Sequence, residues 1–150
     1  MGVKKVPEGY GTVTPYLVNN GVAKVITFVK EVFDAEEIFP PMKREDGSIQ
    51  HAEVRIGNSR IMLGESSGPS GPIPAMLYLY VDDVDATYRK AVQAGAISIS
   101  EPKNQFYGDR SAGVKDVAGN FWYIATHVED VPPSELDKRA KAAMAQPSGA

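Results

Sequence analysis

The stretch DVAGNFWYIAT, Asp116 to Thr126, decides the fold of this chain because it joins a tight turn to an aromatic-rich strand. Asp and Gly favour turns, and the residues that follow are of the kinds that strands prefer. A second Gly-Asn pair, Gly57-Asn58, also precedes an apolar strand-like run. The turn at Gly119 is therefore one of two similar features.

These two turns belong to an internal repeat. Val18 and Val81 each end an apolar strand, two polar residues follow, and a helix-like stretch comes next. The two valines are 63 positions apart, and Gly57 and Gly119 are 62 positions apart. Two matches at nearly one period indicate a duplicated unit. Each half reads as strand, helix and three strands, which predicts an α+β fold of two tandem βαβββ modules.

Periodicity supports both helices and one of the strands. The first helix has one apolar face, formed by Val22, Val25, Ile26, Val29 and Phe33. Asn20 is its expected N-cap, and Asp82 or Asp83 is the expected N-cap of the second helix. Residues 51–56 alternate, with Ala52, Val54 and Ile56 on one face and His51, Glu53 and Arg55 on the other. A half-buried strand has this pattern.

The predicted modules span residues 11–66 and 76–130. A linker rich in Gly, Pro and Ser, residues 67–75, joins them. Residues 41–50 read as a polar loop that could act as a lid. Residues 131–150 read as a C-terminal helix and tail.

Composition excludes several classes of function. The chain of 150 residues has no cysteine, which excludes thiolate zinc sites and cysteine nucleophiles and favours a reducing compartment. Its net charge is −3, without a basic stripe, so a nucleic-acid partner is not expected. No segment reaches the roughly 18 apolar residues of a membrane span. We therefore expect a cytoplasmic protein with neither a nucleic-acid nor a membrane partner.

The doubled unit, with a D-x-x-G-N turn before its last strand, resembles the vicinal oxygen chelate superfamily of glyoxalases, bleomycin-resistance proteins and extradiol dioxygenases. The resemblance covers about residues 11–130. Residues 107–131 are most similar to a glyoxalase-like, phosphonate-operon-associated branch. The resemblance implies two curved mixed sheets around a cup-shaped cavity, and a homodimer. Some members exchange halves between subunits, which the linker 67–75 would allow.

The resemblance also implies four metal-ligand positions. Metal-dependent members hold a divalent ion with His and Glu side chains, and here the matching positions carry Val13, Ile61, Met76 and Tyr123, with Leu63 in place of Ile61 in another alignment. Val, Ile and Leu have no donor atom, and Met is a soft ligand. Tyrosine, with an ordinary pKa near 10, is a poor ligand. We therefore expect no metal and no other cofactor.

The expected function is binding of an aromatic or amphipathic small molecule in the cup. Its expected lining is Leu63, Met76, Tyr78, Tyr80, Phe121 and Tyr123, although the same residues could simply fill the space as core. The alternative is a glyoxalase-like lyase, isomerase or dioxygenase with an atypical site, for which His51 and Glu53 are the acid–base candidates. The face that carries them fits a solvated outer surface equally well. A third alternative is an interaction module that kept the fold without a site.

Two further residues have structural expectations. Trp122 is adjacent to Tyr123 in the expected strand, so it points to the opposite face of the sheet and is expected to pack against a helix. Arg110 follows a Gly-Asp turn and is expected to pair with Asp109 or Asp116, or else to contact a ligand.

Overall fold

The computed structural model describes residues 2–146, so residues 147–150 of the expected C-terminal tail lie outside it. The first module holds β1 (Tyr16–Asn19), α1 (Val22–Phe33), β2 (Glu36–Glu37), β3 (Met42–Lys43), β4 (Ile49–Ile56) and β5 (Ser59–Glu65). The second holds β6 (Met76–Tyr80), α2 (Val84–Gln93), β7 (Ile97–Asn104), β8 (Asp109–Lys115) and β9 (Phe121–His127), and α3 (Pro133–Ala145) follows. Within the described residues, no helix is both long and apolar enough to span a membrane.

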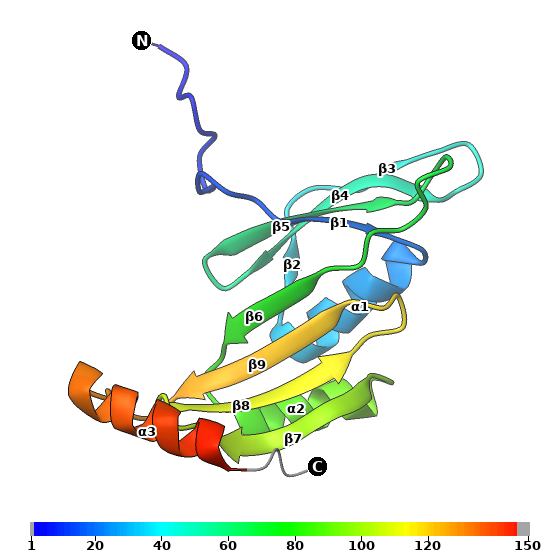
Figure 1. The fold of residues 1–150 in the computed structure, drawn as a ribbon. Coiled ribbons are helices and arrows are strands. Elements are labelled where there is room, and N and C mark those ends of the chain that lie inside the picture. Colours follow the sequence, from blue (N-terminus) through cyan, green and yellow to red (C-terminus); the bar gives the residue numbers. More distant parts are fainter. Residues whose placement is uncertain (1, 147–150) are drawn as a thin grey trace.

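Each module forms its own mixed sheet. The strand orders are β1-β5-β4-β2, with β3 also paired to β4, and β6-β9-β8-β7. In each sheet the first strand of the module runs parallel to the last one, and the other pairs are antiparallel. Both α1 and α2 lie on the same side of the sheets (Figure 1), so each sheet has a helix-covered face and a helix-free face. The predicted α+β fold class is confirmed.

The helix-covered faces form the hydrophobic core. Ala52 and Val54 are almost fully buried there, as the alternation of β4 predicts, and so is Leu63 of β5. The ring of Trp122 is fully buried and lies 5.3 Å from that of Phe33, between centroids, which confirms the expected packing against a helix. Because Phe33 belongs to α1 and Trp122 to β9, this contact joins the two modules.

The N-terminus of α1 is capped from a distant strand. The N-cap residue is Gly21, with a left-handed backbone (φ 87°) and no side-chain cap of its own, so the expected cap by Asn20 is wrong. Glu65 of β5 instead accepts hydrogen bonds from the backbone N–H groups of Gly21, at 2.6 Å, and Val22, at 3.3 Å. A carboxylate at this end of a helix also complements the helix dipole. In α2 the expected cap by Asp83 is confirmed, because its side chain accepts from Ala86 N–H.

The segment expected to be a polar loop, residues 41–50, contains strand structure. Met42 and Lys43 form β3, which pairs antiparallel with β4. Arg44 N–H donates to Ser48 O at 2.9 Å and closes a tight turn at Gly47, whose φ is 87°. Only glycine adopts such a backbone readily. This segment is therefore a hairpin that extends the first sheet.

A buried pair of amides fastens the modules together. Asn120 Nδ2 donates to Asn19 Oδ1 at 2.8 Å, and Asn19 Nδ2 donates to Asn120 Oδ1 at 3.1 Å. Both side chains are fully buried. Asp116 accepts from Asn120 Nδ2 at 2.9 Å and from Trp122 Nε1 at 2.8 Å. Backbone Ala75 N–H, just before β6, donates to Asn120 Oδ1 at 3.0 Å. The Gly-Asn turn thus holds the start of β6 beside the end of β1.

We predict that Asn19→Ala lowers the free energy of unfolding by about 1–3 kcal/mol, because it leaves the buried Asn120 amide without its partner. The repeat supplies a matched control in Asn58, the exposed counterpart of Asn120. Asn58→Ala should change the free energy of unfolding by less than about 0.5 kcal/mol. Urea denaturation of the two variants measures both effects. An equal loss of unfolding free energy in the two variants would show that the Asn19–Asn120 pair does not stabilise the junction.

Candidate functional site

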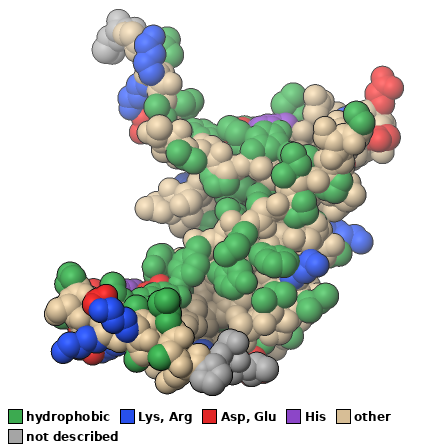
Figure 2. All heavy atoms as spheres, in the orientation of Figure 1, with side chains coloured by type: hydrophobic (Ala, Val, Ile, Leu, Met, Phe, Trp, Pro, Cys, Tyr) green, Lys and Arg blue, Asp and Glu red, His purple; other side chains and the backbone are tan. Residues whose placement is uncertain are grey.

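The helix-free face exposes large apolar side chains where the two modules meet. Along β6 the alternation places Met76, Tyr78 and Tyr80 on this face, with exposed fractions of 65%, 43% and 65%. Tyr16 of β1 is 47% exposed. Ile73 N–H donates to Val18 O at 2.8 Å, so the end of β1 lies beside the segment that leads into β6. Figure 2 shows hydrophobic side chains gathered across the middle of this face, over β6 and β9. We call Tyr16, Met76, Tyr78 and Tyr80 the aromatic surface.

One carboxylate orients two of these tyrosines. The hydroxyls of Tyr78 and Tyr80 donate to Asp109 Oδ2, at 2.8 and 3.0 Å. Tyr80 pairs in register with Ala125, which is fully buried. Burial, followed by hydrogen bonding with Tyr107 and Asp109, raises the pKa of Tyr78, and the hydrogen bond to Asp109 raises that of Tyr80. Both groups therefore keep their protons at neutral pH and act as fixed donors.

Asp109 is also held by a histidine. His127 Nδ1 lies 2.9 Å from Asp109 Oδ1, and His127 Nε2 lies 2.7 Å from Asp130 Oδ1. Hydrogen bonds first to Asp109 and then to Asp130 raise the pKa of His127. Burial disfavours ionisation of Asp109, but its hydrogen bonds with His127, Tyr78 and Tyr80 outweigh this and lower its pKa. A protonated imidazole can donate to both carboxylates, whereas a neutral one has a single N–H.

The remaining predicted lining residues fall into two groups. Phe121 and Tyr123 lie half-buried on the helix-free side of β9, and a Cβ atom at Gly113 would come within 2.8 Å of the Tyr123 ring. Glycine at position 113 therefore leaves the space that the ring occupies over β8. Leu63 is 1% exposed, on the helix-covered side of β5, and belongs to the hydrophobic core. The structure does not bring it to the aromatic surface.

The four positions that correspond to metal ligands in the family do not form a ligand set. Val13 precedes β1 and is exposed, whereas Ile61 is buried in the core. Met76 and Tyr123 lie on the helix-free face, where they offer a thioether and a phenol. Nor do any three His, Cys, Asp or Glu side chains of residues 2–146 gather in a way that could hold a metal ion. The donors present at these positions do not fit a divalent ion, which requires carboxylates or imidazoles.

The expected polar face of β4 holds a connected row of side chains. The Tyr16 hydroxyl lies 3.0 Å from His51 Nδ1, and His51 Nε2 lies 2.8 Å from Glu53 Oε2. Glu53 is 7% exposed, so it does not lie on a solvated surface as one interpretation of the sequence held. Its second oxygen, Oε1, is buried and has no hydrogen-bond partner within the described part of the chain. The alternation of β4 points to His51 and Glu53, but no local pattern in the sequence points to Tyr16.

Gly64 makes room for this row. It lies on β5, between β1, which carries Tyr16, and β4, which carries His51. A Cβ atom at this glycine would lie 3.0 Å from the Tyr16 hydroxyl oxygen and 2.8 Å from Gln50 O. Without a side chain at position 64, the tyrosine reaches across β5 to the histidine.

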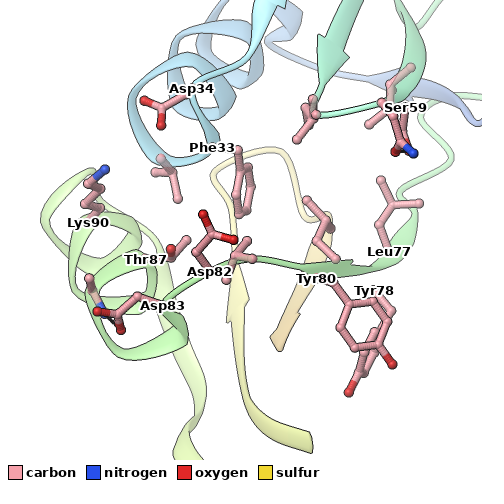
Figure 3. Close-up of a pocket in the computed structure, with 18 of the residues that line it drawn as sticks. Phe33, Asp34, Ser59, Leu77, Tyr78, Tyr80, Asp82, Asp83, Thr87 and Lys90 are labelled. Carbon is pink, nitrogen blue, oxygen red and sulfur yellow. Dashed lines mark hydrogen bonds between the residues drawn. The ribbon is translucent and has the colours of Figure 1, made fainter. Parts of the chain in front are cut away.

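A cavity of about 670 Å³ lies between the modules on the side of the helices. Apolar residues that line it include Phe33, Leu77 and Leu79, and polar ones include Asn58 and Asp82. Tyr78 and Tyr80 also line this cavity, although Figure 3 shows their rings on the side of β6 opposite to Leu77. The cavity and the aromatic surface therefore lie on opposite sides of the same strand.

The internal repeat explains why this end of the junction is open. Asn58 and Asp82 stand where the other end has Asn120 and Asn19. A carboxylate can only accept hydrogen bonds, so Asp82 cannot form a reciprocal amide pair with Asn58.

Arg110 braces the second module rather than its own turn. Its Nε and Nη2 donate to the two carboxylate oxygens of Asp85, at 2.8 and 2.9 Å. The expected pairing with Asp109 or Asp116 is therefore wrong. The bidentate contact ties β8 to the start of α2 and leaves Arg110 engaged within the module.

The raised pKa of His127 predicts a dependence of stability on pH. A pKa that is higher in the folded than in the unfolded chain means that protonation stabilises the fold. The contribution is complete below the ordinary histidine value of about 6.5 and is lost as pH rises through the folded value. His127→Gln removes this titration. Urea denaturation from about pH 6 to pH 9 should therefore show the stability advantage of the unsubstituted chain shrinking, whereas parallel curves would contradict the assignment.

Comparison with known proteins identifies the family. The sequence model of the Glyoxalase/Bleomycin resistance protein/Dioxygenase superfamily matches residues 11–124. The uncharacterized protein Rv0887c of Mycobacterium tuberculosis (strain ATCC 25618 / H37Rv) is 33% identical over 134 residues, which cover 82% of this chain and 78% of that protein. The corresponding protein Mb0911c of Mycobacterium bovis is also 33% identical, over 82% of this chain and 88% of its own length.

Solved structures show the same fold. TioX from Micromonospora sp. ML1 has a TM-score of 0.65 and 21% identity, covering 79% of this chain and all of that chain. The fosfomycin resistance protein FosX from Listeria monocytogenes, solved with Mn(II) and sulfate, has a TM-score of 0.62 and 17% identity, covering 87% of this chain and 97% of that chain. Because the family model matches most of the chain, this chain belongs to the glyoxalase/bleomycin resistance protein/dioxygenase superfamily.

Proposed function

We propose that this protein binds a flat aromatic or amphipathic small molecule on the aromatic surface, without a metal ion. The observation that supports this most directly is the exposure of three side chains of β6 and one of β1: Met76, Tyr78, Tyr80 and Tyr16. Exposed apolar surface of this kind marks sites of interaction. The unsuitable donors at the family's metal positions favour binding over metal-dependent chemistry.

The aromatic surface is also ordered in advance. The hydrogen bonds from Tyr78 and Tyr80 to Asp109 hold the two rings 5.5 Å apart, between centroids, at 62° to each other. A ligand would therefore meet rings whose rotamers are already fixed, which lowers the entropic cost of binding. Met76 adds a flexible, polarisable side chain that adapts to irregular ligands.

Finer points of the proposal rest on the sequence. We place the chain in the phosphonate-operon-associated branch on the similarity of residues 107–131, and we propose a cytoplasmic homodimer. A second copy of the chain is the competing occupant of the aromatic surface. Sedimentation velocity, with and without ligand, separates the two cases. If a second copy of the chain covers Tyr80 in a dimer, added ligand should shift the sedimentation profile from dimer toward monomer.

Proflavine is a suitable probe because it is flat and cationic, and the net charge of −3 weakly favours cations. Tyr80→Ala should weaken its binding by about twofold to tenfold, because an aromatic contact contributes about 0.5–1.5 kcal/mol. Tyr88→Ala is the matched control, since Tyr88 lies on α2 and donates to Ser98 Oγ. Fluorescence titration measures both affinities. An unchanged affinity for Tyr80→Ala, or an equal loss for Tyr88→Ala, would overturn the proposal.

A further inference from the structure

The row formed by Tyr16, His51 and Glu53 fixes the positions of its own protons. A carboxylate only accepts hydrogen bonds, so the imidazole proton must lie on His51 Nε2, which donates to Glu53 at 2.8 Å. In the neutral ring, Nδ1 then presents a lone pair. The Tyr16 hydroxyl, 3.0 Å away, donates its proton to this base. The three residues therefore form a nucleophile, a base and a group that orients the base.

We propose that Tyr16 is a nucleophile for acyl transfer from aromatic esters, with His51 as its base and Glu53 as the residue that holds His51 in the working tautomer. The Tyr16 oxygen attacks the ester carbonyl carbon, and the bond from that carbon to the aryl oxygen breaks. The Tyr16 proton passes to His51 Nδ1 and then to the departing phenolate. Water, with His51 again as base, hydrolyses the acyl-tyrosine. No oxidant, reductant or metal is consumed.

The burial of Glu53, at one end of the row, separates it from an ordinary surface network. Glu53 Oε1 is buried without a hydrogen-bond partner in the described residues. Such an atom carries a cost in stability that a purely structural network would avoid. A desolvated carboxylate interacts more strongly with a positive imidazolium, the species that forms when His51 takes the Tyr16 proton. The arrangement thus favours the charged intermediate of the proposed step.

The chain contains an internal contrast to Tyr16. Tyr80 is more exposed than Tyr16, 65% against 47%. Its hydroxyl, however, donates to the carboxylate of Asp109, which already accepts from Tyr78 and His127. The Tyr16 hydroxyl donates to an imidazole nitrogen that can take the proton. If exposure alone decided reactivity, the Tyr80 hydroxyl would react faster. The proposed relay instead predicts that the Tyr16 hydroxyl reacts faster.

The experiment uses the full chain and 4-nitrophenyl acetate. Release of 4-nitrophenolate gives the rate, and peptide mass spectrometry locates the acetyl group. Tyr16 should be acetylated at least about tenfold faster than Tyr80, because a positioned general base contributes about 10²–10⁴-fold. Acetylation of Tyr80 at an equal or higher rate would overturn the proposal. This outcome does not depend on proflavine binding, so the acyl-transfer proposal can be wrong while the ligand-binding proposal is right, and the reverse.

Variants at position 51 distinguish two possible roles of His51, as a general base and as a purely structural residue. His51→Gln keeps a hydrogen-bond acceptor for Tyr16 but cannot take its proton, so acetylation of Tyr16 should fall by about tenfold or more. An unchanged rate would show that His51 is only structural and would overturn the proposal. In His51→Ala, added imidazole should restore acetylation of Tyr16, and this rescue also reports a folded chain. Failure of imidazole to rescue a variant that melts like the unsubstituted chain would count equally against the relay.

Glu53→Gln tests whether Glu53 keeps the proton of the neutral His51 ring on Nε2. A glutamine amide can donate to His51 Nε2, which moves the ring proton to Nδ1 and removes the lone pair that Tyr16 needs. The rate of acetylation of Tyr16 should fall, while Tyr88→Phe, outside the row, should leave it unchanged. No change for Glu53→Gln would remove this residue from the mechanism and contradict the proposed order of protons.

Discussion

The reciprocal hydrogen bonds between Asn19 and Asn120 are the interaction on which the arrangement of this molecule depends. Residues 101 positions apart in the chain meet there without access to water. An unpaired amide at this depth would be costly, so the pair fixes one relative position of the two modules. That position sets the end of β1 beside the start of β6 and so brings Tyr16 onto the same face as Met76. The aromatic surface is a consequence of this junction.

The helix-free face carries two kinds of tyrosine. Tyr78 and Tyr80 donate to a carboxylate that keeps their protons in place, which suits contact with a ligand. Tyr16 donates to a histidine whose other nitrogen is held by a buried carboxylate. The same phenol group thus donates to two kinds of acceptor in the two sheets, a carboxylate and an imidazole, and the two proposed roles differ in that acceptor. None of these three tyrosines stands at a position that the resemblance assigns to a metal ligand.

Much of the fold could be predicted from the sequence, because the repeat, the alternation of β4 and the turn at Gly119 are local patterns. The sequence also predicts that Trp122 and Tyr123 face opposite sides of the sheet, because neighbouring residues of a strand alternate. Contacts that depend on distant register could not be predicted. Glu65 caps α1 from the far end of its module, and Arg110 reaches Asp85 on α2. The contact between Tyr16 and His51 depends on an empty position on the strand between them, which no spacing along the chain reveals.

Gly64 shows how narrow the basis of the proposed relay is. A methyl group at that position would lie 3.0 Å from the Tyr16 hydroxyl oxygen and 2.8 Å from Gln50 O, so the tyrosine or the strand would have to shift. A relative could keep the tyrosine, the histidine and the glutamate and still lack the relay if it carried alanine there. The useful signature for genome searches is therefore the co-occurrence of four residues, one of which takes part only through the absence of a side chain. Chains of this superfamily sorted by that glycine should divide into two chemical groups that overall sequence identity would not separate.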